Sequence, residues 1–209
     1  MKKYLVEFIG TFFLVLAVGM NVIDCDAHNF LPPLAIGATL MVMVFAGGHV
    51  SGAHYNPAVT LAVWLRGRCA TADVVPYWIS QILGALAASG ITIFLKGNPT
   101  VIPDNISPMP ALVAEFLGTF ALAYVVLNVA TAKGTANNSF YGLAIGFTVM
   151  VMAFALGGIS GGAFNPAVAT GITVLHIEKA ANFWIYLGGD LAGGALAALV
   201  FKFVNPEDK

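Results

Sequence analysis

Charged residues are scarce in this chain of 209 residues, because Asp, Glu, Lys and Arg together make up only 9% of it. A soluble domain carries roughly 25%, so the composition excludes an ordinary soluble protein. Hydrophobic residues make up 59%, and the mean hydropathy is +0.87. This composition places the chain in lipid. The formal net charge of −1 argues against nucleic acid or any strongly charged partner.

Cysteine is also scarce. Cys25 and Cys69 lie far apart and show no metal or redox spacing, so we expect two unpaired thiols, no metal and no cofactor. The first 19 residues have the charge pattern of a signal peptide. They are long for its apolar region, contain Glu7 and precede no clear cleavage site, so we interpret them as a first membrane span.

Six apolar stretches are long enough to cross a bilayer, and we expect spans near 4–22, 32–48, 73–95, 108–130, 140–156 and 181–203. Two further apolar stretches, 56–65 and 165–175, cannot cross a core of about 30 Å at 1.5 Å per residue. Each follows a glycine-rich loop. Irregular backbone at membrane depth is tolerated only where protein buries it or water lines it. We therefore expect two short re-entrant half-helices beside a wet path.

The chain is built twice. The segment LAIGATLMVMVFAGGHVSGAHYNPAV from Leu34 matches LAIGFTVMVMAFALGGISGGAFNPAV from Leu143. Three full spans in each half make the second half enter the membrane from the opposite side. We therefore predict an all-α membrane protein, with one transmembrane channel domain over residues 1–209. Its inverted repeats cover about 1–100 and 108–209, and the functional site lies where they meet.

Each repeat contains one Asn-Pro-Ala tripeptide, composed of Asn56, Pro57 and Ala58 or of Asn165, Pro166 and Ala167. Proline suits the first helical position, and an asparagine before it can cap free backbone donors. Two such half-helices would meet end to end, each with a dipole end of about +0.5 charge. A cation would be repelled there, whereas a neutral solute can accept hydrogen bonds from both asparagines. We expect acceptors along the rest of the path from the carbonyls of Gly52, Ala53, His54, Tyr55, Gly161, Ala163 and Phe164.

The remaining polar residues have structural and functional interpretations. Glu7 and Glu115 lie in apolar spans, where a charge costs several kcal/mol. We expect each to accept hydrogen bonds from a re-entrant loop, and a proton relay is the alternative. Asp190 matches Gln81 in the repeat, so we expect both to make structural polar contacts, although Asp190 is also a candidate solute or proton site. Four aromatic residues are interpreted as interfacial anchors or packing residues, namely Tyr77, Trp78, Trp184 and Tyr186.

The basic residues indicate the orientation. Nearly all of them fall on one side of the predicted spans, namely Lys2, Lys3, Arg66, Arg68, Lys133, Lys202 and Lys209. Only Lys96 and Lys179 fall on the other side. By the positive-inside rule the first group is cytoplasmic, so both termini are expected inside. The short loops favour, by analogy, a bacterial inner (plasma) membrane.

The chain resembles the aquaporins, or major intrinsic proteins, over essentially its whole length. The motifs that carry the resemblance are EFIGTFF, SGAHYNPAVT, EFLGTF and SGGAFNPAV. It implies a homotetramer in which each subunit has its own pore. In most of the family an arginine follows the second tripeptide and narrows the outer mouth, whereas this chain has Val168. The other constriction positions fall at Ile36, Ala153 and Gly162, so we expect a wider, apolar and uncharged constriction.

These features predict a passive channel for water or small uncharged solutes, and not an enzyme. The physiological solute stays open among water, glycerol, urea, ammonia, peroxide and metalloid acids. A secondary transporter is one alternative, because inverted repeats with broken helices occur there too. Against it, the half-helices offer no obvious paired set of ion ligands. A structural membrane protein with a closed pore is the other alternative.

Overall fold

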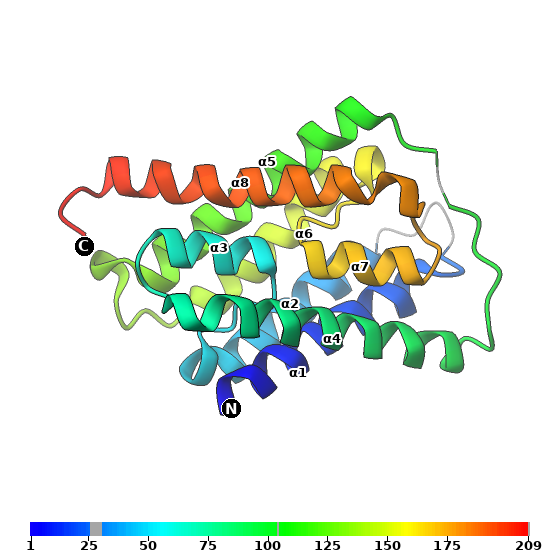
Figure 1. The fold of residues 1–209 in the computed structure, drawn as a ribbon, viewed down its shortest axis with the longest axis horizontal. Helices are drawn as coiled ribbons and strands as arrows, with labels where there is room; N and C mark the ends of the chain where they lie inside the picture. The colour runs from blue at the N-terminus through cyan, green and yellow to red at the C-terminus, as the bar shows by residue number, and fades with distance from the viewer. Residues whose placement is uncertain (26–30, 104, 209) are drawn as a thin grey trace.

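The computed structural model describes residues 1–25, 31–103 and 105–208, and within them the fold is entirely helical (Figure 1). The helices of the first half are α1 (Lys2–Val22), α2 (Leu31–Ser51), α3 (Pro57–Leu65) and α4 (Thr71–Leu95). Those of the second half are α5 (Pro108–Val126), α6 (Tyr141–Ser160), α7 (Pro166–Val174) and α8 (Phe183–Val204). A π-helical turn, η1 (Leu127–Thr131), extends α5, and two 3₁₀ turns, η2 (Lys133–Thr135) and η3 (Ala180–Asn182), precede α6 and α8.

Six of the described helical segments are long and apolar enough to cross a membrane, and they match the six predicted spans. The predicted ends of two spans were too early, because α2 and α6 continue through their glycine pairs to Ser51 and Ser160. Both helices stop where a glycine takes the left-handed conformation, Gly52 and Gly161 with φ of 86° each. This conformation is the usual end of a helix, and glycine adopts it without steric cost.

The two short helices lie in the middle of the molecule. Each of α3 and α7 has nine residues, about 14 Å at 1.5 Å per residue, so neither can cross the core. They lie end to end between the long helices (Figure 1). Each one packs against a long helix of the other half, α3 on α8 and α7 on α4. The halves are therefore interlocked at the centre.

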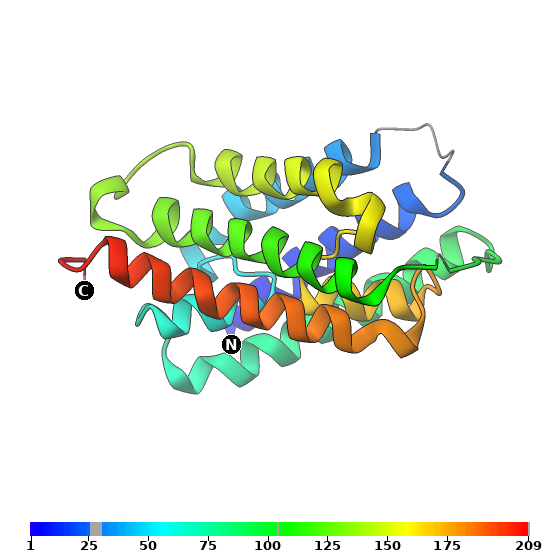
Figure 2. The same ribbon diagram turned by 90° about the horizontal axis from the view of Figure 1, so that it is seen from above.

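The long helices repeat one packing scheme in both halves. In the first half α1 packs against α4 and α2, and in the second half α5 packs against α8 and α6 (Figure 2). The halves also meet where α2 crosses α6. A Cβ atom on Gly37 would lie 2.7 Å from the carbonyl oxygen of Gly146, and one on Gly146 would lie 2.5 Å from that of Gly37. Glycine at both positions is what allows these backbones to approach so closely.

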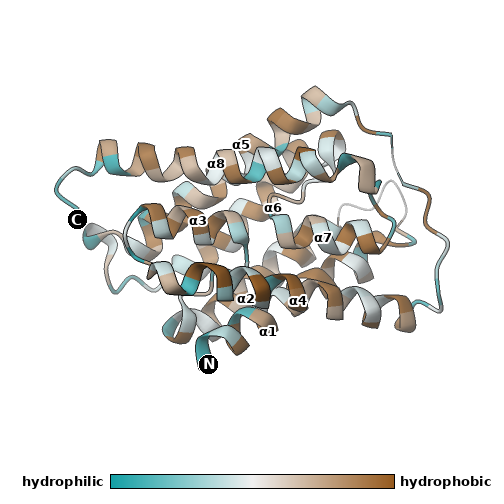
Figure 3. Ribbon diagram, in the orientation of Figure 1, coloured by the Kyte–Doolittle hydropathy of each residue, from teal (hydrophilic) through white to brown (hydrophobic). Residues whose placement is uncertain are grey.

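Apolar residues run along the outer faces of the long helices, and polar residues gather at their ends (Figure 3). Large exposed residues such as Leu83, Phe147 and Leu199 point outward from mid-helix positions. An outer surface of this kind faces lipid in a membrane protein, whereas a soluble monomer rarely exposes large apolar patches.

A cluster of polar contacts around Asp208 connects three segments at one end of the molecule. Arg66, just after α3, forms an ion pair with Asp208 at 2.6 Å, although only 2% of the arginine side chain is exposed. Its guanidinium also lies 4.7 Å from the centre of the Phe201 ring. Asp208 accepts a further hydrogen bond from the backbone N–H of Lys133 at 2.7 Å. The segment after α8 thus joins the end of α3 to the connection between α5 and α6.

Candidate pore

The asparagine of each tripeptide caps its half-helix. Asn56 Oδ1 accepts from the backbone N–H groups of Ala58 at 2.8 Å and Val59 at 3.4 Å. Asn165 Oδ1 accepts in the same way from Ala167 at 2.9 Å and Val168 at 3.4 Å. Proline fills the first helical position in both helices. Each helix therefore begins as the local sequence predicts, and the amide nitrogen of the capping asparagine remains available for other acceptors.

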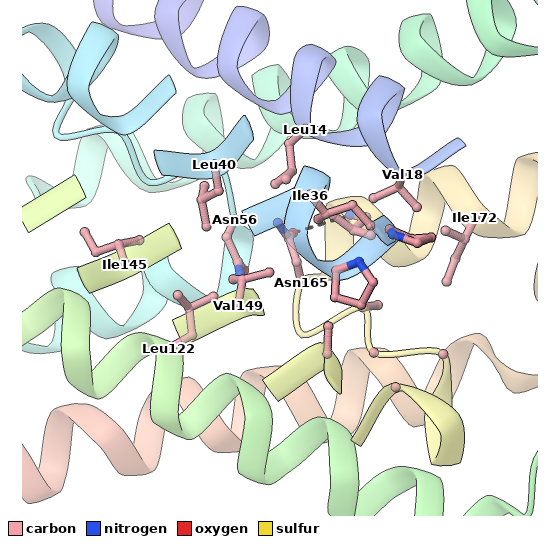
Figure 4. Close-up of a pocket in the computed structure, with 18 of the residues that line it drawn as sticks. Leu14, Val18, Ile36, Leu40, Asn56, Leu122, Ile145, Val149, Asn165 and Ile172 are labelled. Atoms are coloured by element: carbon pink, nitrogen blue, oxygen red, sulfur yellow. Dashed lines mark hydrogen bonds between the residues drawn. The ribbon is translucent and has the colours of Figure 1, made fainter. Parts of the chain in front are cut away.

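The amide nitrogens of the two asparagines bind the opposite loops. Asn56 Nδ2 donates to the carbonyl oxygen of Phe164 at 2.8 Å, and Asn165 Nδ2 donates to that of Tyr55 at 2.9 Å. Both asparagines lie together in the central cavity (Figure 4). An amide nitrogen carries two hydrogens, so each asparagine keeps one N–H for another acceptor.

Tyr55 and Phe164 depart from the expected carbonyl path. Their carbonyl oxygens accept from the asparagines, and neither residue lines the central cavity or the second cavity described below. Their rings instead pack behind the loops, against glycines of α1 and α5. A Cβ atom on Gly10 would lie 2.1 Å from the Tyr55 ring, and one on Gly118 would lie 2.2 Å from the Phe164 ring. The glycine of each Glu-Phe-x-Gly motif thus makes room for a loop aromatic.

A buried glutamate holds the first loop. Glu7 Oε1 accepts from Ser51 Oγ at 2.7 Å and from the backbone N–H of His54 at 2.9 Å. Its Oε2 accepts from the backbone N–H of Tyr55 at 2.6 Å and from Gln81 Nε2 at 2.8 Å. The carboxylate therefore satisfies loop donors that no helix or strand would satisfy.

Glu115 makes the corresponding contacts in the second half. Its Oε1 accepts from Ser160 Oγ at 2.5 Å and from the backbone N–H of Ala163 at 3.1 Å, and its Oε2 accepts from the N–H of Phe164 at 2.6 Å. These bonds hold a strained backbone, because Tyr55 and Phe164 have φ of 50° and 47°, where residues other than glycine are uncommon.

Two tyrosines have a role that the sequence interpretation missed. Tyr77 and Tyr186 were expected as interfacial anchors or packing, but both are buried. Their hydroxyls donate to the last carbonyls of α2 and α6, on Ser51 at 2.7 Å and on Ser160 at 2.6 Å. The signal was present in the sequence, because the spacing between the tyrosines equals that between the serines.

The central cavity has a volume of about 270 Å³ and an amphipathic wall. Aliphatic side chains form part of this wall, and Figure 4 labels eight of them around the asparagines: Leu14, Val18, Ile36, Leu40, Leu122, Ile145, Val149 and Ile172. The polar part consists of the two asparagines and of loop residues, namely Ala53, His54, Gly161, Gly162 and Ala163. The four positions carried over as a constriction, Ile36, Ala153, Gly162 and Val168, all line this cavity. No Asp, Glu, Lys or Arg of the described residues lines it.

A second cavity of about 800 Å³ opens toward the end that holds Arg68 and Lys133. Gly52 lines it, as do His49 and Ser51. The walls of the two cavities share only His54, Val126 and Ile145. The His54 ring lies between them, and its Nδ1 is 3.1 Å from Thr60 Oγ1. The two cavities are therefore neighbours that meet at a junction of these three residues.

Two half-helices that meet inside an inverted repeat, beside an amphipathic path, define a membrane pore protein. Sequence comparison agrees with this class. The profile of the family described as Major intrinsic protein matches residues 1–201. The chain belongs to this family, and its six apolar spans make it an integral, multi-pass membrane protein.

Individual relatives are similar over nearly the whole chain. Aquaporin NIP1-1 from Zea mays is 36% identical, over 98% of this chain and 76% of its own length. Glycerol uptake facilitator protein-like 6 from Lactiplantibacillus plantarum is 35% identical over 100% of both chains. Nodulin-26 from Glycine max is 34% identical, over 100% of this chain and 80% of its own. The aquaglyceroporin from Plasmodium falciparum has the same fold, with a TM-score of 0.84 at 20% identity, covering 99% of this chain and 97% of its own.

Proposed function

We propose that this protein is a passive channel for water and small uncharged solutes. The observation that carries the proposal is the pair of half-helix N-termini beside a central cavity that no Asp, Glu, Lys or Arg of the described residues lines. Each capping asparagine binds the opposite loop with one N–H and keeps the other for a passing solute. A solute that both donates and accepts hydrogen bonds can therefore donate to the loop carbonyls and accept from the asparagine N–H groups, while its apolar part passes the aliphatic side chains of the cavity.

Cations are excluded at the same point. The N-terminal ends of α3 and α7 each carry about half a positive charge, and no acidic residue of the described chain faces the central cavity to compensate. An ion would also lose its water against aliphatic side chains, which is costly. Conduction then needs no moving part and no chemical step, as expected of a channel and not of an enzyme.

Solutes larger than water are included in the proposal. Ile36, Ala153, Gly162 and Val168 bring no charge and no side-chain hydrogen-bond donor to the cavity. The relative named as a glycerol uptake facilitator supports glycerol as the first solute to test. Because these four residues are uncharged, we expect selection by solute size to occur at the junction formed by His54, Val126 and Ile145.

The two alternatives have less support. A secondary transporter moves one half against the other around its site, yet here each asparagine bonds to the opposite loop and each half-helix packs on the other half. A closed structural protein does not require a central cavity without charged lining residues and with spare amide donors. We further propose a homotetramer in a bacterial plasma membrane, with the end that holds Lys3, Arg66 and Lys133 in the cytoplasm.

Flux into proteoliposomes tests the channel proposal. Stopped-flow light scattering should give water and glycerol fluxes that rise linearly with the gradient, do not saturate and ignore ion gradients. Saturation, or coupling to an ion gradient, would indicate a transporter, and flux no faster than through protein-free vesicles would indicate a closed pore.

The substitution Val168→Arg tests whether the side chain at position 168 faces the solute in the central cavity. An arginine brings a fixed charge and five donors to an apolar site, so glycerol flux should fall more than water flux, and any proton leak should fall as well. Val168→Leu adds bulk without charge and separates the two effects. If Val168→Arg folds normally but leaves the water-to-glycerol ratio unchanged, Val168 does not face the solute.

A further inference from the structure

Asp190 lies on α8 behind the second pore loop, wholly buried and outside both cavities. In the first half the matching residue is Gln81, which donates its amide to Glu7 Oε2 at 2.8 Å and to Thr60 Oγ1 at 3.0 Å. The repeat therefore places a carboxyl group where its other copy has an amide donor. An aspartate that has lost its proton can only accept hydrogen bonds, so it cannot do what Gln81 does.

The surroundings of Asp190 supply too few donors for two ionised carboxylates. Its Oδ1 accepts from Thr119 Oγ1 at 2.9 Å, and the backbone N–H of Asn165 also faces the carboxyl group, whereas the buried Oδ2 accepts no hydrogen bond of good geometry in the described structure. The side chain of Glu115 lies beside this turn of α8, because a Cβ atom on Gly189 would lie 3.0 Å from Glu115 Cβ, and the charge of Glu115 acts on Asp190. No ion pair with a basic residue is formed by either group among the described residues. Two adjacent buried carboxylates would repel each other strongly, so they share one proton.

The other ionisable groups nearby do not remove this conflict. Tyr186, one turn earlier on α8, donates its hydroxyl to Ser160 O and to Glu178 Oε2. Glu178 is itself buried and is occupied by Lys179 N and Asn182 Nδ2. An ionised Glu178 would add negative charge to the region and supply no donor to Asp190.

The hydrogen bonds of Glu115 decide which carboxyl holds the proton. Both of its oxygens already accept, one from Ser160 Oγ and Ala163 N and the other from Phe164 N. A proton on Glu115 would weaken these acceptors, whereas Asp190 Oδ2 has no donor to lose.

We propose that Asp190 is a neutral carboxylic acid whose Oδ2–H donates to Glu115, and that it thereby performs for the second loop the task that Gln81 performs for the first. It is a positioning residue. Glu115 fixes the N–H of Phe164, and the carbonyl of Phe164 accepts from Asn56 at the centre of the path. The contribution to flux rests on the proposed channel function, but the protonation state does not.

Infrared difference spectroscopy of the reconstituted protein tests the proposal. At neutral pH the wild type should show the carbonyl stretching band of a protonated carboxyl group in an apolar site. The band should shift in D₂O and be missing from Asp190→Asn. A wild type without such a band overturns the proposal whatever the variants do, and a band that persists in Asp190→Asn does so as well.

Two substitutions test whether the proton of Asp190 stabilises the protein by donating to Glu115. Asp190→Asn keeps a donor toward Glu115, so its melting temperature should stay near that of the wild type. Asp190→Leu removes the donor and should lower both the melting temperature and the water flux. In alkaline solution the wild type should lose more stability than Asp190→Asn, because only the wild type has this proton to lose. Equal damage in both variants at neutral pH, or an equal alkaline loss in wild type and Asp190→Asn, would contradict the proposal. If the infrared result holds while no variant conducts, the channel function has failed and the assignment of the proton has not.

Discussion

The two pore loops are held by the same set of hydrogen bonds, but a different side chain contacts the glutamate of each set on the side away from the cavity. In both, a glutamate binds two consecutive loop N–H groups and a helix-ending serine, and a tyrosine binds that serine's carbonyl. Behind the first loop stands the amide of Gln81, and behind the second the carboxyl of Asp190. The hydrogen bonds of the glutamate, serine and tyrosine are thus the same in both halves, whereas the residue that contacts the glutamate, Gln81 or Asp190, differs. The glutamate, serine and asparagine therefore determine the conformation of the loop. The residues behind them need only satisfy the remaining hydrogen-bonding capacity of the glutamate.

Removing the glutamates should give the largest effects and should differ between the halves. Glu7→Ala leaves four donors without an acceptor, at about 1–3 kcal/mol for each buried donor that finds no water. Glu115→Ala leaves three donors and, by the proposal above, the Oδ2–H of Asp190, but Asp190 can lose this proton and then accept hydrogen bonds as a carboxylate, which Gln81 cannot do. Both variants should lose flux, and Glu7→Ala should unfold at the lower temperature. Thermal unfolding in detergent measures this order; equal melting temperatures would show that Gln81 and Asp190 are equivalent, and the reverse order would contradict the prediction.

The tyrosines sharpen the comparison at a smaller scale. Tyr77→Phe removes one bond, to the carbonyl of Ser51, and should cost about 1 kcal/mol. Tyr186→Phe removes a hydroxyl whose single hydrogen is shared between Ser160 O and Glu178 Oε2, and it leaves the buried Glu178 without that donor, so it should cost more than Tyr77→Phe, about 2 kcal/mol. Unfolding midpoints of the two variants, read against the wild type, test the difference. Equal shifts would mean that the bond to Glu178 contributes nothing.

The smallest effect is expected at Asp208, which secures α3 and has no counterpart at α7. The backbone N–H of Lys133, followed by the Arg66 guanidinium, lowers the pKa of Asp208 below its ordinary value of 3.8. Its contribution to stability is therefore complete above that value and is lost as the pH falls through the lower pKa of the folded state. Asp208→Asn should lower the melting temperature by no more than about 2 °C at neutral pH, less than either tyrosine variant, and its melting temperature should converge with that of the wild type in strong acid.

Glu207→Gln provides the matched control for this substitution. It removes the same charge one residue away, from an exposed side chain, and should leave the melting temperature unchanged. If Glu207→Gln and Asp208→Asn lower the melting temperature equally, a general charge effect and not the contact with Arg66 is responsible.

Much of this architecture could be predicted from the sequence because it follows from local patterns. The lengths of the apolar stretches predicted six spans and two half-helices, and the Asn-Pro pairs predicted where α3 and α7 begin. The glycine pairs of α2 and α6 misled the prediction, because the left-handed turn comes only at Gly52 and Gly161.

The partners of individual polar atoms could not be predicted. A repeat pairs positions that are alike, but the amide of Asn56 bonds to Phe164 and not to Asn165. Nothing near Arg66 in the sequence indicates that Asp208 will cover it. Such contacts depend on how distant segments pack, and a single sequence carries no direct record of that packing.

The bonds between asparagines and opposite loops also have a consequence for the order of folding. The partner of Asn56 lies 108 residues further along the chain, and that of Asn165 lies 110 residues back. Contacts this remote in sequence close slowly, because the intervening chain must first be ordered. During synthesis the first loop therefore stays incomplete until Phe164 has entered the membrane. The centre of the path is among the last parts of the molecule to form, and a protein stalled before that point has its first spans in place and no finished pore.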